Sequence, residues 1–188
     1  MKIALFGGRF DPIHNGHLAV AREVLKVKAA DEVWFSLDNQ HQWRPIVASA
    51  KDRKHMLKLA IGENKKFKID ETPLRIGGVT ETISVIRNLR KHIKTEIVFV
   101  VGSDQISTFH KWTHWKDLVK ELTFLIVARK GSPITDIPKN CIVIDDPNYE
   151  PLEDSATRIR DKINNGESIT DLVPKAVEEY IISHGLYL

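Results

Sequence analysis

Residues 5–18 read LFGGRFDPIHNGHL and place an apolar segment, a glycine pair and two histidines in close succession. The segment 2–6 (KIALF) is typical of a short strand that is buried in a parallel sheet. Gly7 and Gly8 follow it, and glycine lets a backbone turn tightly or approach a ligand closely. A strand that ends in glycines is therefore expected to lead into a ligand-binding loop.

The histidines of this stretch are expected at the start of a helix. Apolar residues recur at helical spacing over 18–27, which predicts a helix that begins between His14 and Gly16. His14 and His17 then lie about one turn apart on the same side of its amino-terminal end. Because that end of a helix carries unpaired N–H groups and partial positive charge, it favours anions. The pattern indicates a polyphosphate site.

Composition is that of an ordinary globular chain. The 188 residues are 42% hydrophobic and 28% charged, as expected for one domain over 1–188. The basic residues behind the net charge of +3 are spread out, and no basic face with interleaved aromatic residues indicates a nucleic-acid partner. With no signal peptide and no apolar run as long as a membrane span, we expect no membrane partner and a cytoplasmic location. The single cysteine, Cys141, is expected to be a buried strand thiol.

Strand and helix patterns alternate along the chain. Strands separated by helices imply right-handed crossovers, and hence a Rossmann-like, doubly wound parallel α/β sheet with helices on both faces. Ligands of such sheets bind at the carboxyl ends of the strands, beside the switch point. Strands are expected at 2–6, 32–37, 67–69, 96–101, 124–128 and 141–144, and helices at 49–61, 80–92 with Thr80 as cap, 155–165 and 174–184.

Three segments from distant parts of the sequence meet at that edge of the predicted sheet. The first is the glycine-histidine loop, and the second is 102–104 (GSD), which follows a buried strand. The third is 154–160 (DSATRIR), where hydroxyl groups at a helix start are followed by Arg158 and Arg160. Because these two guanidinium groups point in different directions, only one is expected to face the site.

These motifs resemble those of the HxGH-type nucleotidyltransferases, and among them the bacterial nicotinate mononucleotide adenylyltransferases. Residues 14–17 (HNGH) match the signature within a GGxFDPxHxGHL context, and 155–160 (SATRIR) are similar to the family's SSTxIR motif. Residues 102–115 resemble its GxD and WxxW segments, and 180–187 (YIISHGLY) resemble its YIxxxxLY ending. The resemblance spans nearly the whole chain.

The chain departs from the family pattern at four places. Arg9 stands where bacterial members often have Thr or Ser, and Ala156 replaces the second Ser of the SSTxIR motif. The loop 38–47 lacks the usual Pro-Pro-His-Lys, and 78–80 (GVT) replace a common Ser-Tyr-Thr. The last two departures fall where the second substrate is expected, so they bear on the acceptor more than on the chemistry.

The resemblance implies transfer of AMP from ATP to nicotinate mononucleotide, which gives nicotinate adenine dinucleotide and pyrophosphate in NAD biosynthesis. The acceptor phosphate attacks the α-phosphorus in line, so no protein nucleophile is needed. His14, His17 and Arg160 are the predicted catalytic residues, and Mg²⁺ is expected to be bound through the ATP phosphates. The predicted ATP site comprises Gly7, Gly8, Arg9, Phe10, His14, His17, Gly102, Asp104, Ser155, Thr157, Ile159 and Arg160.

A second set of residues is predicted to bind the acceptor. Backbone N–H groups near Thr80 and Thr82 can receive a carboxylate, which would tell nicotinate from nicotinamide; an ordinary helix cap is the alternative. An indole can stack on a pyridine ring, and the family pattern favours Trp112 over Trp115. Asp104 is expected to contact the ribose or the metal shell, or to cap the next helix. The predicted acceptor site comprises Asp11, Thr80, Thr82 and Trp112.

Other functions stay open on the sequence alone. A sister enzyme acting on nicotinamide mononucleotide or pantetheine phosphate would use the same ATP site with a different second pocket. A non-catalytic nucleotide sensor would bind ATP and release no pyrophosphate. Trp43 is a candidate lid residue in the divergent loop. Both a monomer and a homodimer are compatible with the sequence.

Overall fold

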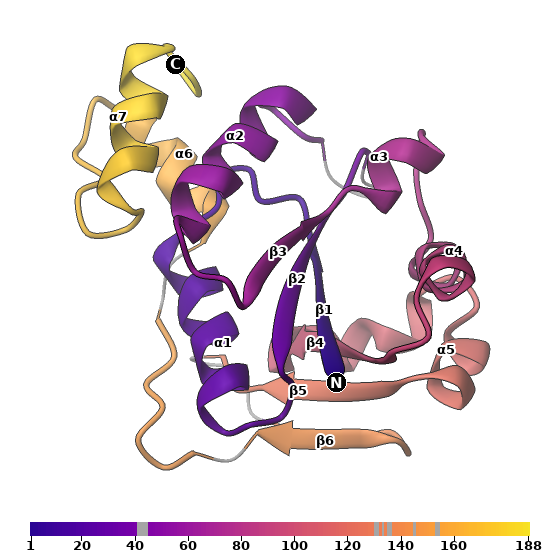
Figure 1. Cartoon of the computed structure of the whole chain (residues 1–188). Coiled ribbons are helices and arrows are strands. Elements are labelled where there is room, and N and C mark those ends of the chain that lie inside the picture. The colour runs from indigo at the N-terminus through magenta and orange to yellow at the C-terminus, as the bar shows by residue number, and fades with distance from the viewer. Residues whose placement is uncertain (41–44, 130–131, 133, 135–136, 145, 153–154) are drawn as a thin grey trace.

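The computed structural model describes residues 1–40, 45–129, 132, 134, 137–144, 146–152 and 155–188 (Figure 1). Its strands form one parallel sheet in the order β3-β2-β1-β4-β5-β6. The predicted doubly wound α/β fold is therefore confirmed. The strands are β1 (Lys2–Gly8), β2 (Glu32–Leu37), β3 (Phe67–Asp70), β4 (Glu96–Gly102), β5 (Thr123–Val127) and β6 (Cys141–Ile144).

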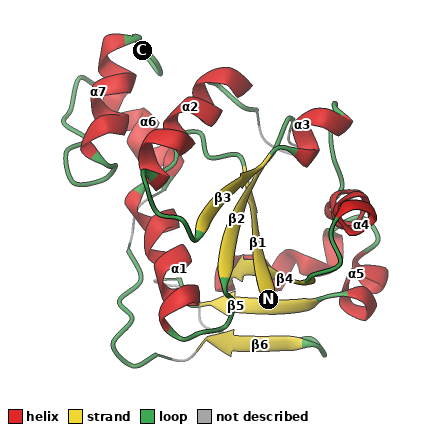
Figure 2. Ribbon diagram, viewed as in Figure 1, coloured by secondary structure: helices red, strands yellow, loops and turns green. Residues whose placement is uncertain are grey.

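Helices cover both faces of the sheet (Figure 2). Side chains of α1, α2, α6 and α7 pack on one face, and those of α4, η1 and α5 pack on the other. The helices are α1 (Asn15–Lys26), α2 (Ala50–Ile61), α3 (Thr72–Ile76), α4 (Thr82–His92), α5 (Trp115–Glu121), α6 (Ala156–Asn164) and α7 (Lys175–Ser183), and η1 (Ser103–Lys111) is a 3₁₀-helix.

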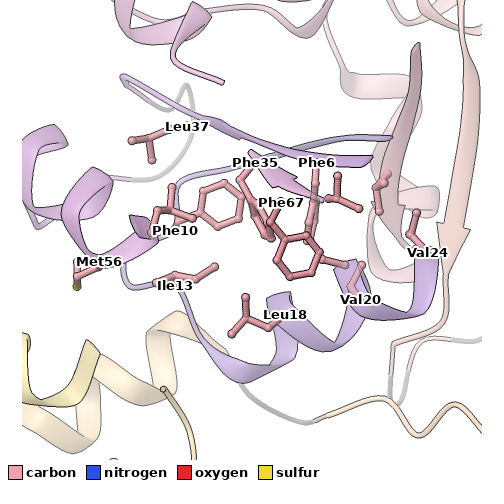
Figure 3. Close-up of a cluster of buried hydrophobic side chains, with 14 of the residues drawn as sticks. Phe6, Phe10, Ile13, Leu18, Val20, Val24, Phe35, Leu37, Met56 and Phe67 are labelled. Carbon is pink, nitrogen blue, oxygen red and sulfur yellow. The ribbon is translucent and has the colours of Figure 1, made fainter. Parts of the chain in front are cut away.

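Alternation along β1 explains why two cores form. Ala4 and Phe6 belong to the core beneath α1, whereas Leu5 belongs to the core on the opposite face. Figure 3 shows aromatic rings from β1, β2 and β3 gathered above the apolar side of α1, where Leu18 and Val20 point toward them. Burial of each large apolar side chain contributes about 1.5–3 kcal/mol.

The strand order reverses between β1 and β4. From β1 the chain winds outward through β2 and β3, and from β4 it winds outward on the other side through β5 and β6. The two central strands pair in register, with Leu5 opposite Phe99. A Cβ atom on Gly7 would lie 3.0 Å from the Phe99 ring, so this glycine allows close packing at the switch point. Ligands of doubly wound sheets bind at this crevice.

Several local details differ from the sequence-based predictions. The glycine pair is the end of β1, and the turn follows at residues 11–12, after Phe10, whose φ is +47°. Glu81, not Thr80, is the cap of α4. The short helix α3 is absent from the predictions, and the helical segment expected at 110–118 is divided between the end of η1 and the start of α5. Cys141 is half-buried rather than buried, because β6 is an edge strand, and burial raises the pKa of its thiol.

Candidate active site

The two histidines of the HNGH motif lie against each other at the start of α1. His14 is the N-cap, and its main-chain N–H donates a hydrogen bond to His17 Nδ1 over 3.3 Å. Their ring centroids are 3.7 Å apart. Because Nδ1 of His17 accepts this bond, the proton of the neutral imidazole lies on Nε2. His17 is therefore set to donate a hydrogen bond from Nε2.

Burial keeps both imidazoles uncharged. His14 is 2% exposed, and desolvation, assisted by Arg129, lowers its pKa to about 3. Desolvation also lowers the pKa of His17 well below its usual value, with smaller contributions from His14, Arg129 and Arg9. His14 Nδ1 is buried and lacks a hydrogen-bond partner within the described part of the chain. Buried polar atoms are normally hydrogen-bonded, so an exception of this kind indicates a functional position.

Arg129 is a site residue that sequence reasoning missed. It follows β5 by two positions, and its charge acts on both imidazoles. Its main-chain N–H donates to Ser103 Oγ over 2.9 Å, and its Nε lies 3.7 Å from Asp104 Oδ1. No motif marks Arg129, but a basic residue directly after a buried strand at the predicted ligand-binding edge was an available signal.

The GSD segment after β4 depends on its glycine. A Cβ atom on Gly102 would lie 2.3 Å from Asp104 Oδ1 and 3.0 Å from Arg129 Cγ. Asp104 itself is exposed and accepts a hydrogen bond from Gln105 Nε2 over 2.9 Å. Gly102 therefore makes room for a carboxylate and a guanidinium stem to meet at the carboxyl end of β4.

Arg160 connects the end of the chain to its beginning. Its Nη1 donates to the main-chain oxygen of Asp11 over 2.7 Å, and its Nη2 donates to Thr157 Oγ1 over 3.3 Å. Asp11 precedes His14 by three residues, so the guanidinium lies against the loop that carries the histidines. Arg160 is half-buried and Arg158 is exposed, as expected if only one of them faces the site.

The start of α6 is built as the motif suggests. Ser155 is the N-cap and accepts the Arg158 N–H over 3.2 Å, and Thr157 is exposed in the first turn. Ile159 is fully buried in the core beneath α1, so its side chain cannot contact ATP and only its backbone is available. The same holds for Phe10, whose ring is 1% exposed and packs 5.1 Å from the His17 ring.

Asp11 has a different role from the predicted one. Its carboxylate is 1% exposed and accepts hydrogen bonds from the N–H groups of Val47 (2.7 Å) and Ala48 (3.0 Å) and from the Tyr187 hydroxyl (2.9 Å). A carboxylate with three internal partners is not available for the acceptor. Asp11 instead ties the loop before α2 and the carboxyl terminus to the histidine loop.

Arg53 of α2 is a second residue that sequence reasoning missed. It is 1% exposed, and its guanidinium donates to the main-chain oxygens of Arg9 (2.7 Å), Asp38 (2.8 Å) and Ala48 (3.2 Å). One buried charge thus joins the loops after β1 and β2 to the start of α2. Burial raises the pKa of Asp38 to about 6, although Arg53 and Arg9 act in the opposite direction.

Residues predicted for the acceptor gather at the start of α4. Thr80 Oγ1 is buried and makes no hydrogen bond among the residues described. Asn39 Nδ2 donates to the Gly78 main-chain oxygen over 3.2 Å, which links the end of β2 to this turn. Thr82 opens α4, and its cap Glu81 makes no side-chain hydrogen bond to the first turn in the described structure. The start of a helix whose cap side chain makes no hydrogen bond therefore lies beside a hydroxyl that has no partner among the described residues.

Both tryptophans of the WxxW pair are half-buried. The Trp112 ring packs 5.0 Å from Phe109 and 6.1 Å from Phe99, on the core face of η1. The Trp115 ring lies 5.9 Å from the Lys116 ammonium. Trp43 and Asp154, which the sequence also singled out, lie outside the described residues.

Two hollows occur away from the histidines. One opens between the end of β2 and the start of α2, beside Asn39, Val47 and Arg53. The other lies at the amino-terminal ends of β4 and β5, which is the edge of the sheet opposite to His14. Only the first adjoins the residues described above. In the described ranges no three His, Cys, Asp or Glu side chains converge as metal ligands.

The sequence profile of the cytidylyltransferase-like family matches residues 5–162. The chain belongs to this family. A probable nicotinate-nucleotide adenylyltransferase of Lactiplantibacillus plantarum is 35% identical over 189 residues, which cover 99% of this chain and 88% of the relative. One of Thermus thermophilus is 34% identical over 189 residues and covers both chains completely. The predicted family resemblance is thereby confirmed.

Solved structures confirm the fold of this family member. Nicotinic acid mononucleotide adenylyltransferase of Plasmodium falciparum, complexed with NaAD, superposes with a TM-score of 0.85 over 99% of this chain and 97% of that one, at 22% identity. A protein of Vibrio parahaemolyticus described as a putative nicotinate-nucleotide adenylyltransferase superposes with a TM-score of 0.71 over 96% of this chain and 98% of that one, at 18% identity. None of the described helices is long and apolar enough to cross a membrane.

Proposed function

We propose that this nucleotidyltransferase moves the adenylyl group of ATP to the phosphate of nicotinate mononucleotide. The observation that carries the proposal is the close pair of neutral imidazoles, His14 and His17, on a loop that also receives Arg160. Relatives that cover the whole chain carry the name of this activity. The products are nicotinate adenine dinucleotide and pyrophosphate.

The reaction needs positioning and charge neutralisation rather than a protein nucleophile. An oxygen of the acceptor phosphate forms a bond to the α-phosphorus, while the bond from that phosphorus to the bridging oxygen breaks and pyrophosphate leaves with the electron pair. His17 donates its Nε2–H to an ATP phosphate oxygen. His14 donates a hydrogen bond to a second oxygen from Nδ1, which has no partner among the described residues. The guanidinium groups of Arg160 and Arg129 share the charge of the departing phosphates.

Magnesium fits this site as an ion carried by the triphosphate. Mg²⁺ prefers oxygen ligands and keeps several of its waters, so phosphate oxygens and water molecules can supply most of its ligands. Asp104 is an exposed carboxylate that can contact one of those waters. When bound, the ion neutralises phosphate charge.

The start of α4 is our proposed site for the nicotinate carboxylate. The helix end offers N–H groups, and Thr80 offers an unpaired hydroxyl. A carboxylate accepts hydrogen bonds from these groups, whereas the amide of a nicotinamide presents its own N–H donors to them. Trp112 lies on the same side of the molecule as the α4 core and stacks on the pyridine ring.

Pyrophosphate release from ATP and Mg²⁺ tests this proposal with three acceptors. We expect kcat/KM with nicotinate mononucleotide to exceed that with nicotinamide mononucleotide by at least about tenfold, since a buried donor left facing an amide is penalised by ~1–3 kcal/mol. Turnover with phosphopantetheine but with neither mononucleotide would refute nicotinate mononucleotide as the acceptor, whereas adenylyl transfer from ATP would stand. ATP binding with no turnover on any acceptor would indicate a nucleotide sensor.

A further inference from the structure

The last turn of the chain brings the Tyr187 side chain into contact with Asp11 of the histidine loop. Helix α7 ends in a Schellman motif, in which the Leu186 N–H donates to Ile181 O and the Gly185 N–H donates to Ile182 O. Gly185 has a φ of +58°. Tyr187 follows with a φ of +69°, a backbone conformation that residues other than glycine rarely adopt. A strained conformation of this kind persists only where surrounding contacts hold it.

The contact that holds Tyr187 is buried. The residue is 8% exposed, and its hydroxyl donates to Asp11 Oδ1 over 2.9 Å across 176 positions of sequence. Desolvation and the Asp11 carboxylate raise the pKa of this phenol far above its usual value, so the hydroxyl stays protonated as a donor. No sequence pattern predicts this pairing, since it joins the first and last segments of the chain.

Asp11 transmits this contact to the proposed ATP site. Its side chain holds the N–H groups of Val47 and Ala48, and its main-chain oxygen receives Arg160 Nη1 over 2.7 Å. The position of Asp11 therefore sets where the Arg160 guanidinium lies relative to the histidines that follow three residues later. Tyr187 makes no described hydrogen bond to the histidines or to Arg160. The charges of Arg160 and Arg53 act on its hydroxyl, and its described hydrogen bond to the site is the one to Asp11.

We propose that Tyr187 is a positioning residue, which holds Asp11 so that Arg160 meets the phosphates of ATP. The inference rests on the proposed function, because it assigns the triphosphate to Arg160. It concerns the hydroxyl alone, since a phenylalanine at the same position keeps the ring packing and loses only the hydrogen bond. Because Tyr187 acts on the phosphates indirectly, we expect an effect no larger than that of one ordinary hydrogen bond, which is roughly a fivefold to tenfold change in an equilibrium constant.

The test is the affinity for adenosine 5′-(α,β-methylene)triphosphate with Mg²⁺, measured by calorimetry without any acceptor. We expect Tyr187→Phe to weaken binding about fivefold to tenfold. Tyr180→Phe is the matched control, because its hydroxyl donates to Asp52 Oδ1 over 2.9 Å, on α2 and away from Asp11. This control is expected to bind within about twofold of the wild type.

A double-mutant cycle separates positioning from general loosening. In an Arg160→Ala background, Tyr187→Phe should change the affinity by less than about twofold, because the group that it positions is gone. Equal losses in both backgrounds, or an equal loss in Tyr180→Phe, would overturn the positioning role, as would unchanged binding by Tyr187→Phe. Failure of the wild-type protein to bind the analogue would instead overturn the proposed function, and the inference with it.

Discussion

The uncharged state of His14 and His17 is the main chemical property of the site at the residue scale. The lowered pKa values keep both imidazoles neutral in the free protein. Phosphate charge nearby favours the protonated form, so an imidazole can take up a proton when ATP binds. The positive charges near the imidazoles are the guanidinium groups of Arg129 and Arg160. We therefore expect the imidazoles to form hydrogen bonds with the phosphates and the arginines to neutralise their charge.

Replacing His17 by alanine removes the Nε2–H donor proposed for the phosphates. We expect kcat to fall at least about a hundredfold, because loss of a preorganised donor costs about 3–4 kcal/mol in the transition state. Pyrophosphate release measures the effect, and circular dichroism checks the fold. His92→Ala, at an exposed position on α4, serves as the control and should keep wild-type turnover. A His17→Ala enzyme with near-normal kcat would contradict the assignment.

The lowered pKa of His14 makes the fold sensitive to acid. The folded state holds this imidazole neutral down to about pH 3, whereas the unfolded chain protonates it below about 6.5. The free energy of unfolding therefore falls as the pH drops through this window, by about 2 kcal/mol between pH 7 and pH 5 for one such group. Urea unfolding at both pH values should show a drop that is larger in the wild type than in His14→Gln by about this amount. Equal drops would argue against a neutral, buried His14.

At the scale of single elements, the ends of the strands determine the geometry of the site. Each strand at the switch point ends in a residue that allows an unusually close approach, and each following loop is held by buried polar contacts. Gly102 and Arg53 illustrate the two devices, one by the absence of a side chain and the other by a buried guanidinium.

Gly102→Ala is expected to disturb the site through contact alone. The φ of −74° at this position suits alanine, but the new Cβ would lie 2.3 Å from Asp104 Oδ1. We expect kcat/KM to fall at least about tenfold, with a loss of about 1–3 kcal/mol in stability from overpacking. Gly166→Ala is the contrasting variant: its φ is +69° and its Cβ meets open space, so it should lose about 1 kcal/mol of stability and keep its kcat. Matching kinetic losses in both variants would contradict this account.

Arg53→Met should destabilise the fold strongly. It leaves the main-chain oxygens of Arg9, Asp38 and Ala48 without their donor in a buried place. Removal of one partner from a buried charged network costs about 3–5 kcal/mol. Chemical denaturation provides the measurement, with Arg22→Met on the exposed face of α1 as a control that should change stability by less than about 0.5 kcal/mol. A loss below about 1 kcal/mol at Arg53 would show that water replaces its hydrogen bonds.

For the whole molecule, the proposed ATP site joins segments from both ends of the chain. Arg160 of α6 meets the loop after β1, and α7 continues to Tyr187, which returns to that same loop. A ligand bound there adds contacts between segments that already share a hydrophobic core and several long-range hydrogen bonds. Ligand binding should therefore stabilise the complete fold.

A non-hydrolysable ATP analogue at a hundred times its Kd should raise the melting temperature by roughly 5–10 °C, which corresponds to about 2.7 kcal/mol. His17→Ala and Arg160→Ala should each lose most of this shift at the same concentration, because they remove contacts from opposite ends of the chain. Arg87→Ala, which breaks an ion pair with Glu121 on the other face of the sheet, should retain it. Differential scanning fluorimetry distinguishes these outcomes. A wild-type rise in melting temperature in Arg160→Ala would show that Arg160 of α6 does not contact the bound ATP analogue.

The sequence by itself determined the strand and helix alternation, the parallel sheet and the local motifs at 14–17 and 155–160, because hydrophobic periodicity and turn residues act over short distances. The tertiary structure alone showed that Arg53 and Arg129 lie beside the loops of the proposed site and that the Asp11 carboxylate is held by internal hydrogen bonds. It also decided that Glu81, not Thr80, caps α4, and that the Thr80 hydroxyl has no hydrogen-bond partner within the described ranges. The physical reason is that burial and hydrogen-bond partners depend on residues far apart in sequence, which only the packing of helices on the sheet brings together.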